Sequence, residues 1–428
     1  MTSFGSDLIL ARLRRLHPKA IDLSLDRMWR ILAALDHPER RLAPAVHIAG
    51  TNGKGSALAF LDAMLQADGL RTQRYVSPHL VHFNERILFD GMPVDEEILA
   101  DVLDVAERTN RGLPITEFEI TTAAAFLAFA ARPADVLLME TGLGGRLDAT
   151  NVLERPKVTA LSAISLDHQA FLGYRLVDIA FEKAGILKPG VTAVVGPQPP
   201  EALDVIERRA SALGAPLLVH GRDWSASASG SRLRVRLLDR DLELPAPALA
   251  GRHQFENAGL AVVLARLFAP QLPEDAIAQG LLAARWPARL QRLDRGALLA
   301  GVPDHLEVWL DGGHNPAAGK VLAESLADDP RDLHLVVGML RTKDAQGFIA
   351  PLSRIASSLT AVPVPDEPAS RPAAELAAEA ERLGLKASVA PDVGAALRAI
   401  GARAAPGARV LICGSLYLAG AVLRENVV

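Results

Sequence analysis

Short apolar runs alternate with segments of helical spacing along most of the chain. Residues 46–49 form an apolar run, apolar side chains then recur at helical spacing through 57–65, and Gly69 can end that helix. The runs at 136–139 and 158–161 are almost continuously apolar, which is typical of strands buried on both faces of a parallel sheet. This alternation predicts an α/β fold with helices on both sides of a mostly parallel sheet.

The pattern changes between residues 217 and 247. Polar and apolar side chains alternate at 232–237, as expected of a half-exposed antiparallel strand. Residues 257–268 return to helical spacing, and Trp286-Pro287 then breaks the pattern. We therefore expect an antiparallel strand followed by a helix before the break.

A second alternating set begins near residue 306. Its strand candidates are the apolar runs 308–310, 335–337, 359–362 and 410–412. Helical stretches rich in alanine and leucine lie between them. We predict a first domain at residues 1–288, built on the mostly parallel sheet, and a smaller α/β domain at residues 289–428. The junction is expected near residues 286–293.

Composition excludes some classes of partner. Lys and Arg total 46 against 50 Asp and Glu, so the net charge is −4 and gives no electrostatic case for nucleic acid or an anionic membrane. The single cysteine, Cys413, lies in an apolar run and is expected to be a core residue in a reducing compartment. The N-terminal residues lack the features of a signal peptide, and the uncharged stretch at 120–131 is too short to span a membrane. We expect a cytoplasmic protein.

The strongest local motif is GTNGKGS at residues 50–56, between a predicted strand and a predicted helix. Glycines let backbone N–H groups turn toward phosphate oxygens, and the helix start adds a favourable dipole. Lys54 supplies a positive charge for the phosphates, and Ser56 supplies a hydroxyl near Mg²⁺. The alternative, a glycine-rich turn without a ligand, would leave this combination unexplained. We predict an ATP site made of Thr51, Asn52, Gly53, Lys54, Gly55 and Ser56.

Polar side chains follow other predicted strands. Ser77 comes after the strand candidate 74–76, and Glu140 and His168 also follow strands at their carboxyl ends. Ligands of open α/β sheets bind at those ends, and oxygen ligands suit magnesium. A histidine is less typical for Mg²⁺, and by itself His168 is more often structural.

The order of residues in the phosphate loop carries a family resemblance. A glycine separates Lys54 from Ser56, unlike the common G-x-x-x-x-G-K-[ST] pattern. This variant resembles the Mur ligase superfamily, and within it the folylpolyglutamate synthase and dihydrofolate synthase branch. Further matching segments, in family order, are SPHL at 77–80, ETGLGGRLDATN at 140–151, LDH at 166–168, EKAGI at 182–186 and DGGHNP at 311–316. The resemblance runs from about Ile21 to Ser415.

The resemblance implies a metal site. It implies that Ser77, Glu140 and His168 are ligands of magnesium, with one or two ions bound beside ATP. It also implies that Lys183 is carbamylated by CO₂, which would turn a cation into a carboxylate able to support a metal. From the sequence alone, Glu182-Lys183 is most simply a solvated pair on a helix.

Nucleotide contacts are implied in both predicted domains. Asn257, Arg289 and Asp311 match residues that contact the nucleotide in the family, and His314 matches a further residue of the second domain's site, which we place among the catalytic residues. Where this chain has Ala288, the family usually has glycine. The alternative for Asn315-Pro316 is a helix N-cap followed by proline at the first helical position.

The resemblance also implies a pterin site assembled from three segments. Its members are Ile21 and Asp22, then Thr116, Phe118 and Glu119, then Leu147, Asp148 and Ala149. Phe118 could stack on a flat ring, although a phenylalanine in the core is the default.

These features predict an ATP-dependent amide ligase. ATP would phosphorylate a carboxylate, and the amine of L-glutamate would attack the acyl phosphate, so no protein nucleophile is needed. The expected acceptors are 7,8-dihydropteroate, folylglutamates, or both, and the family default is a monomer. The alternatives are a folylpolyglutamate synthase alone, another Mur-type amide ligase, and a nucleotide switch or ATPase without ligase chemistry.

Overall fold

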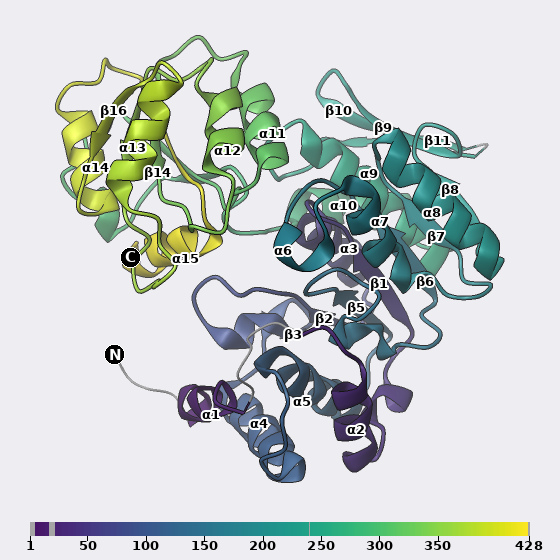
Figure 1. The fold of residues 1–428 in the computed structure, drawn as a ribbon. Helices are drawn as coiled ribbons and strands as arrows, with labels where there is room; N and C mark the ends of the chain where they lie inside the picture. The colour runs from purple at the N-terminus through teal and green to yellow at the C-terminus, as the bar shows by residue number, and fades with distance from the viewer. Residues whose placement is uncertain (1–4, 17–21, 239, 427–428) are drawn as a thin grey trace. The chain divides into compact units, whose positions relative to one another are not determined.

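The computed structural model describes residues 5–16, 22–238 and 240–426 (Figure 1). The chain divides into two compact units. The first contains Met1–Ala248 and Phe255–Ala284, and the second contains Leu249–Gln254 and Arg285–Val428. Ile21, one of the predicted pterin-site residues, lies outside the described residues.

The first unit is built on an eight-stranded sheet in the order β4-β3-β2-β5-β1-β6-β7-β8. The strands are β1 (Ala45–Ala49), β2 (Thr72–Tyr75), β3 (Ile87–Phe89), β4 (Met92–Pro93), β5 (Val136–Glu140), β6 (Val158–Leu161), β7 (Ala193–Val195) and β8 (Leu217–Val219). The six neighbouring strands β2, β5, β1, β6, β7 and β8 are parallel to one another, and β3 and β4 add an antiparallel edge. The mostly parallel sheet that the apolar runs predict is confirmed.

Helices cover both faces of this sheet, which explains why most residues of its central strands β1, β5 and β6 are apolar. The helices are α1 (Gly5–Leu13), α2 (Asp26–Ala34), α3 (Lys54–Ala67), α4 (Glu96–Asn110), α5 (Glu117–Ala131), α6 (Gln169–Leu172), α7 (Leu176–Lys183), α8 (Pro200–Leu213), α9 (His253–Phe268) and α10 (Glu274–Ala283). Short 3₁₀ helices are η1 (Pro38–Arg41), η2 (Phe83–Arg86), η3 (Ala149–Val152) and η4 (Ala184–Ile186).

The alternation of side chains along each strand separates the two faces. Helices α2, α4 and α5 pack on the face that includes Leu137 and Met139, and α7 and α8 pack farther along the same face around Leu161. Helix α3 covers the opposite face of β2 and β5, and α10 packs on α3 (Figure 1). Gly280 permits that approach, because a Cβ atom there would collide with the backbone of Met64.

A small antiparallel sheet follows the main sheet. It consists of β9 (Trp224–Ser229), β10 (Arg232–Leu237) and β11 (Arg240–Pro245), with β10 in the middle. Exposed and buried side chains alternate along β10, so the half-exposed antiparallel strand predicted at 232–237 is confirmed. The helix predicted at 257–268 is α9, which begins one turn earlier at His253.

The second unit holds a six-stranded sheet in the order β12-β13-β17-β14-β15-β16, parallel except for the pairing of β12 with β13. The strands are β12 (Gln291–Leu293), β13 (Glu307–Leu310), β14 (Leu333–Val337), β15 (Ser358–Ala361), β16 (Lys386–Val389) and β17 (Arg409–Cys413). The helices are η5 (Ala297–Leu299), α11 (Pro316–Leu326), α12 (Ala345–Leu352), α13 (Ala373–Arg382), α14 (Val393–Gly401) and α15 (Leu416–Glu425). A second α/β unit, as predicted, is confirmed.

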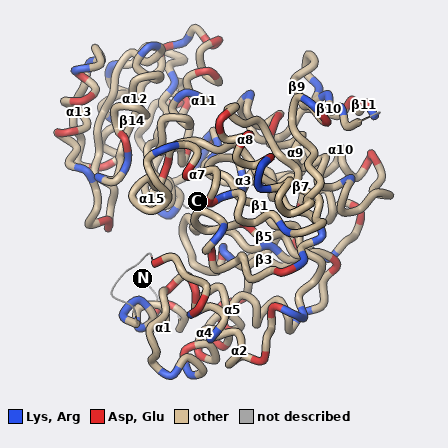
Figure 2. Tube along the Cα trace, turned by 45° about the vertical axis from the view of Figure 1, so that its right-hand side comes forward, with Lys and Arg blue, Asp and Glu red and all other residues tan. Residues whose placement is uncertain are grey.

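Basic and acidic residues are interspersed along both units (Figure 2). In the part of the chain that the structure describes, no helix combines the length and the apolar character needed to cross a membrane.

Candidate active site

The phosphate loop lies between β1 and α3 and is held by the segment that follows β6. The backbone N–H groups of Thr51 and Asn52 both donate to the carbonyl of Ala163. The Thr51 hydroxyl donates to the carbonyl of Ser165 and accepts from its N–H, each at 3.0 Å. Gly53 has φ of 89°, a left-handed conformation that favours glycine. The loop therefore has a fixed shape at the carboxyl ends of two neighbouring parallel strands.

Lys54 points back into this loop from the first residue of α3. Its ammonium group donates to the carbonyl of Gly50 at 3.1 Å and lies 3.5 Å from the Glu140 carboxylate at the end of β5. Ser56, one turn into the helix, is buried. The cation and the helix start suit nucleotide phosphates, and the nearby Glu140 carboxylate suits the metal ion that accompanies them.

Asn257 of α9 touches the same loop. A Cβ atom at Gly53 would collide with the side-chain oxygen of Asn257. Both residues belong to the first unit. The glycine therefore lets the amide lie against the loop, which places it where a nucleotide contact is predicted.

Lys183 is buried, and this overturns the simplest interpretation of Glu182-Lys183 as a solvated pair. Its ammonium group donates to the carbonyl of Gly50 at 2.9 Å, so Lys54 and Lys183 share one acceptor. Burial, and then the charge of Lys54, lower the pKa of Lys183 to about 7. Glu182 instead pairs with Arg146 at 2.8 Å.

The glycine-rich segment after β5 is docked on the backbone that carries Lys183. A Cβ atom at Gly145 would lie 2.8 Å from the carbonyl oxygens of both Glu182 and Lys183. The Arg146 N–H donates to the Glu182 carbonyl at 2.7 Å. Close backbone approach therefore needs glycine at 145, and it brings the predicted pterin loop next to Lys183, which is predicted to be catalytic and carbamylated.

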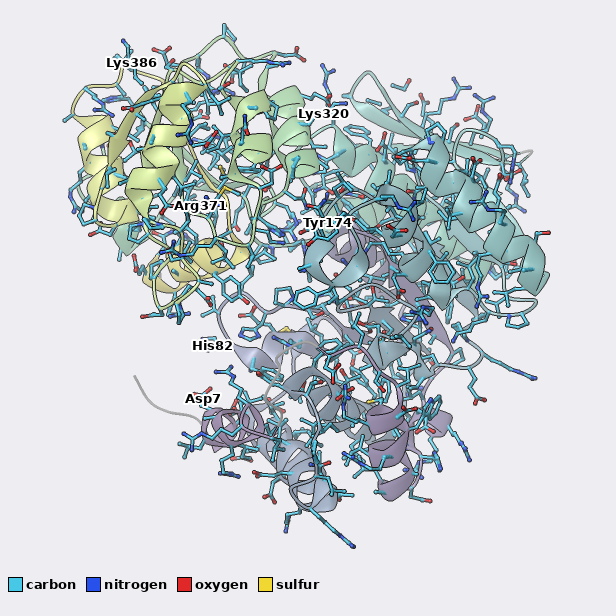
Figure 3. The ribbon with its side chains drawn as sticks, in the orientation of Figure 1. Asp7, His82, Tyr174, Lys320, Arg371 and Lys386 are labelled. Atoms are coloured by element: carbon cyan, nitrogen blue, oxygen red, sulfur yellow. The ribbon has the colours of Figure 1, made fainter. Side chains whose placement is uncertain are left out.

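The remaining predicted metal ligands belong to the same unit: Ser77 lies two residues after β2, whereas His168 lies seven residues after β6 and not at the end of the strand. The Ser77 hydroxyl oxygen is buried and has no hydrogen-bond partner among the described residues. His168 is exposed, has φ of 50° and precedes α6. The exposed Tyr174 follows that helix (Figure 3). Within the described residues there is no group of three His, Cys, Asp or Glu side chains that could hold a metal.

The predicted pterin segment at the start of α5 contacts the glycine-rich loop after β5. The ring of Phe118 lies against Gly142, where a Cβ atom would collide with it. Thr116 caps α5 and exchanges hydrogen bonds with Glu119, accepting at 3.2 Å and donating its N–H at 2.8 Å. The start of α5 and the loop after β5 therefore form one wall.

Arg27, which no sequence motif predicts as a site residue, joins a third predicted segment to this wall. Its guanidinium lies 2.9 Å from the Glu119 carboxylate and 3.1 Å from that of Asp22. No motif includes Arg27, and the only local signal is its position five residues after Asp22. The side chain links residues that are far apart in the sequence.

The predicted nucleotide residues of the second unit form their own group. Asp311 accepts from the N–H of Leu290 at 2.8 Å and of Gly313 at 2.6 Å, and burial raises its pKa. Arg289 lies beside Gly312, and Nδ1 of His314 is 2.9 Å from the Gly312 carbonyl oxygen.

Ala288 and Asn315 flank this group, and each has a role in the local backbone. Ala288 has φ of 56°, so the backbone that the family usually builds with glycine is adopted here by alanine. Asn315 caps α11 by accepting from the Ala318 N–H, and Pro316 is the first helical residue, as the structural alternative expected.

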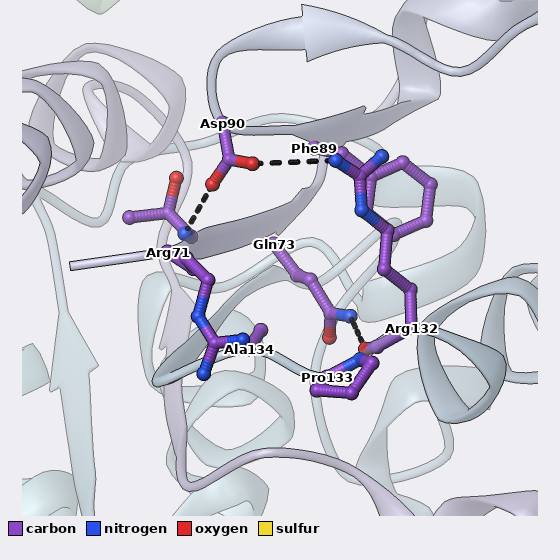
Figure 4. A pocket seen from close by; sticks show the side chains of 8 residues that line it. Arg71, Gln73, Phe89, Asp90, Arg132, Pro133 and Ala134 are labelled. Atoms are coloured by element: carbon purple, nitrogen blue, oxygen red, sulfur yellow. Dashed lines mark hydrogen bonds and ion pairs between the residues drawn. The ribbon is translucent and has the colours of Figure 1, made fainter.

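A separate hollow of about 190 Å³ opens at the start of β2, the end of the strand away from Ser77 (Figure 4). Arg71, Gln73, Phe89, Asp90 and Arg132 line it. Its arginines are paired, Arg71 with Asp135 and Arg132 with Asp90. None of the predicted site residues lies here.

Comparison with known proteins agrees with this arrangement. The model of the Mur ligase glutamate ligase domain matches residues 292–416. The dihydrofolate synthase/folylpolyglutamate synthase of Bacillus subtilis is 37% identical over 354 residues, covering 78% of this chain and 80% of that protein.

Solved structures are similar over nearly the whole chain. E. coli FolC in complex with DHPP and ADP has a TM-score of 0.87 at 31% identity, covering 99% of this chain and 97% of that one. The bifunctional folylpolyglutamate synthase/dihydrofolate synthase of Yersinia pestis, complexed with AMPPNP and Mn ion, has a TM-score of 0.87 at 32% identity, covering 99% and 98%. The resemblance carried by the motifs is thereby confirmed. The chain belongs to the dihydrofolate synthase/folylpolyglutamate synthase family of the Mur ligase superfamily, the ATP-dependent ligases that attach glutamate in folate metabolism.

Proposed function

We propose that this chain attaches L-glutamate both to 7,8-dihydropteroate and to folylglutamates. The observation that carries the proposal is the meeting, within the first unit, of the phosphate loop with the predicted pterin wall. Lys183 donates to Gly50 of the phosphate loop, and Gly145 of the glycine-rich segment packs on the backbone of Lys183. The relative solved with both DHPP and ADP supports this pairing of ligands, and the relative solved with AMPPNP and Mn ion supports the nucleotide part.

The reaction needs activation of a carboxylate. A carboxylate oxygen of the acceptor attacks the γ-phosphorus of ATP, and ADP leaves. The amine of glutamate then attacks the acyl carbon, loses a proton and expels phosphate. Lys54 stabilises charge on the transferred phosphoryl group, and the loop N–H groups orient the nucleotide.

The donor set fits a magnesium ion. Ser77 presents a buried oxygen without a partner among the described residues, Glu140 presents a buried carboxylate, and Ser56 adds a hydroxyl near the phosphates. We propose that these residues, with His168, hold the ion that accompanies ATP. Bound magnesium would offset negative charge on the phosphates.

Replacing Glu140 with alanine is expected to raise the magnesium concentration needed for half-maximal activity by about tenfold or more, because it removes the only Asp or Glu among the proposed ligands. A magnesium titration at fixed ATP measures this. Glu201→Ala, which changes an exposed carboxylate on α8, is the matched control. An identical titration in Glu140→Ala and the control would remove Glu140 from the metal site.

We also propose that Lys183 is carbamylated. Only a neutral amine attacks CO₂, and a pKa of about 7 makes this amine largely neutral at pH 8, whereas an ordinary lysine is almost fully protonated there. The reaction forms an N–C bond between Nζ and CO₂ and releases a proton, and the resulting carbamate carries a negative charge.

With ¹³C-labelled bicarbonate, NMR is expected to show a protein carbamate signal that grows as the pH rises from about 6 to about 8, through the lowered pKa of Lys183. Lys183→Arg, which keeps a cation but offers no amine, is expected to lack the signal. The same signal in both proteins would assign the carbamate to another group.

A product assay tests the proposed function. Purified protein is given ATP, Mg²⁺ and labelled glutamate, with dihydropteroate and tetrahydrofolate offered in separate reactions. We expect product from both acceptors. Product from tetrahydrofolate alone would make the chain a folylpolyglutamate synthase only. ATP consumption without either product would favour another Mur-type ligase or an ATPase.

A further inference from the structure

A buried chain of hydrogen bonds connects the strand of the phosphate loop to the glycine-rich loop. It begins at His47 on β1, three residues before Gly50. His47 Nε2 lies 2.9 Å from the Thr150 hydroxyl, which donates to Asp148 Oδ1 at 2.5 Å. All three side chains are buried, with at most 2% of their surface exposed.

Burial raises the pKa of Asp148, and the hydrogen bonds that its oxygens accept from Leu143 and Thr150 oppose that rise. With the carboxylate ionised, the hydrogen bonds run in one direction. The only proton of the Thr150 hydroxyl is used on Asp148, so that hydroxyl accepts from His47, whose proton must be on Nε2. Burial lowers the pKa of His47 to about 3, so the ring is neutral and Nδ1 carries no proton. Consistently, Nδ1 has no hydrogen-bond partner in the described part of the chain.

At its other end, this series of hydrogen bonds closes a loop of the backbone. Asp148 Oδ2 accepts the Leu143 N–H at 2.7 Å, and Oδ1 also accepts the Thr150 N–H at 3.0 Å. The carboxylate thus fastens the beginning of the loop, at 143, to its end, at 150. Between these points lie Gly145, which packs on the backbone of Lys183, and the predicted pterin residues Leu147 and Ala149.

We propose that His47 and Thr150 are positioning residues for the acceptor substrate: they hold the Asp148 carboxylate, and through it the 143–149 loop, in register with the phosphate-loop strand. This inference rests on the proposed function. One strand then sets both the nucleotide phosphates and the loop that presents the pterin, so the acceptor carboxylate and the γ-phosphate keep a fixed separation. Three apolar side chains would fill the same part of the core without the cost of burying a carboxylate that needs hydrogen-bond donors. The use of a buried carboxylate here therefore favours a positioning role for these residues.

The test compares Thr150→Val, which keeps the shape but lacks the hydroxyl, with Thr150→Ser, which keeps it. We expect Thr150→Val to weaken dihydropteroate binding and raise its KM by about ten- to a hundredfold. The KM for ATP and the affinity for ADP should change by less than about twofold, since the phosphate loop keeps its own contacts with residues 163–165. Thr150→Ser should restore wild-type values.

His47→Phe, which keeps a ring without a donor, covers the case in which Thr150→Val does not fold, and we expect the same selective rise. The double variant should be no worse than Thr150→Val, because both remove one chain of bonds. Equal changes for pterin and nucleotide, or no change for either, would reduce the chain to a structural role and overturn the inference. If the wild-type protein fails to bind dihydropteroate, both the proposed function and this inference are overturned. The measurement on the wild type alone shows that outcome, so it is distinguished from a failure of the inference by itself.

Discussion

Replacing Lys54 with alanine is expected to lower the rate of ligation by at least about a hundredfold while the protein stays folded. The ammonium group is held at the mouth of the phosphate loop by the Gly50 carbonyl and lies 3.5 Å from Glu140. Charge grows on the phosphoryl group during transfer, and removing one preorganised countercharge costs about 3 kcal/mol. We expect the fold to survive: the variant loses the largely buried ion pair with Glu140, but it also loses the repulsion between Lys54 and Lys183 and an unfavourable cation at a helix start.

The measurement is the rate of glutamate incorporation at saturating ATP, with circular dichroism to verify folding. Lys320→Ala is the matched control, since it removes an exposed lysine from α11 (Figure 3). Normal turnover by Lys54→Ala would refute the assignment of the phosphate loop. Unfolding of the variant would show that Lys54 is needed for the fold, and Lys54→Met, which keeps the stem, would then separate the two roles.

The parallel sheets were predictable because several of their strands are buried on both faces and are therefore mostly apolar. The runs at 136–139 and 335–337 fall inside β5 and β14 for this reason. Strand β16 was not predicted because it lies at the edge of its sheet and carries the polar residues Lys386 and Ser388. It therefore lacks the continuous apolar run that marks a buried strand. Edge position is a property of the assembled sheet and is not encoded locally.

The phosphate loop was predictable for a different reason: its function depends on consecutive backbone groups, so its residues are adjacent in the sequence. The environment of Lys183 was not. Its burial depends on Gly145, which docks from a segment almost forty residues earlier, and the local pattern at 182–186 is also that of a solvated helix end. The bridge made by Arg27 between Asp22 and Glu119 likewise forms only once the helices pack.

Replacing Arg74 with methionine is expected to lower the free energy of unfolding by about 3–5 kcal/mol. Arg74 on β2 and Asp62 on α3 form an ion pair at 3.0 Å with side chains 8% and 3% exposed. Methionine would leave the Asp62 carboxylate buried with Gln66 as its neutral partner, at 2.7 Å. Urea unfolding followed by circular dichroism measures the loss.

The double variant Arg74→Met/Asp62→Leu separates charge from packing. Two apolar side chains of similar volume remove both desolvated charges at once, so stability should return to that of the wild type or exceed it. Equal destabilisation of the single and double variants would instead mean that the stem of Arg74 contributes through packing. Because Arg74 shares the α3 face of the sheet with Glu140 and interacts electrostatically with it, the ligation rate of the double variant carries separate information. A stable but slow double variant would mean that the pair is kept for the charge it presents to the active site, whereas a stable and fully active one would leave the pair without a role in catalysis.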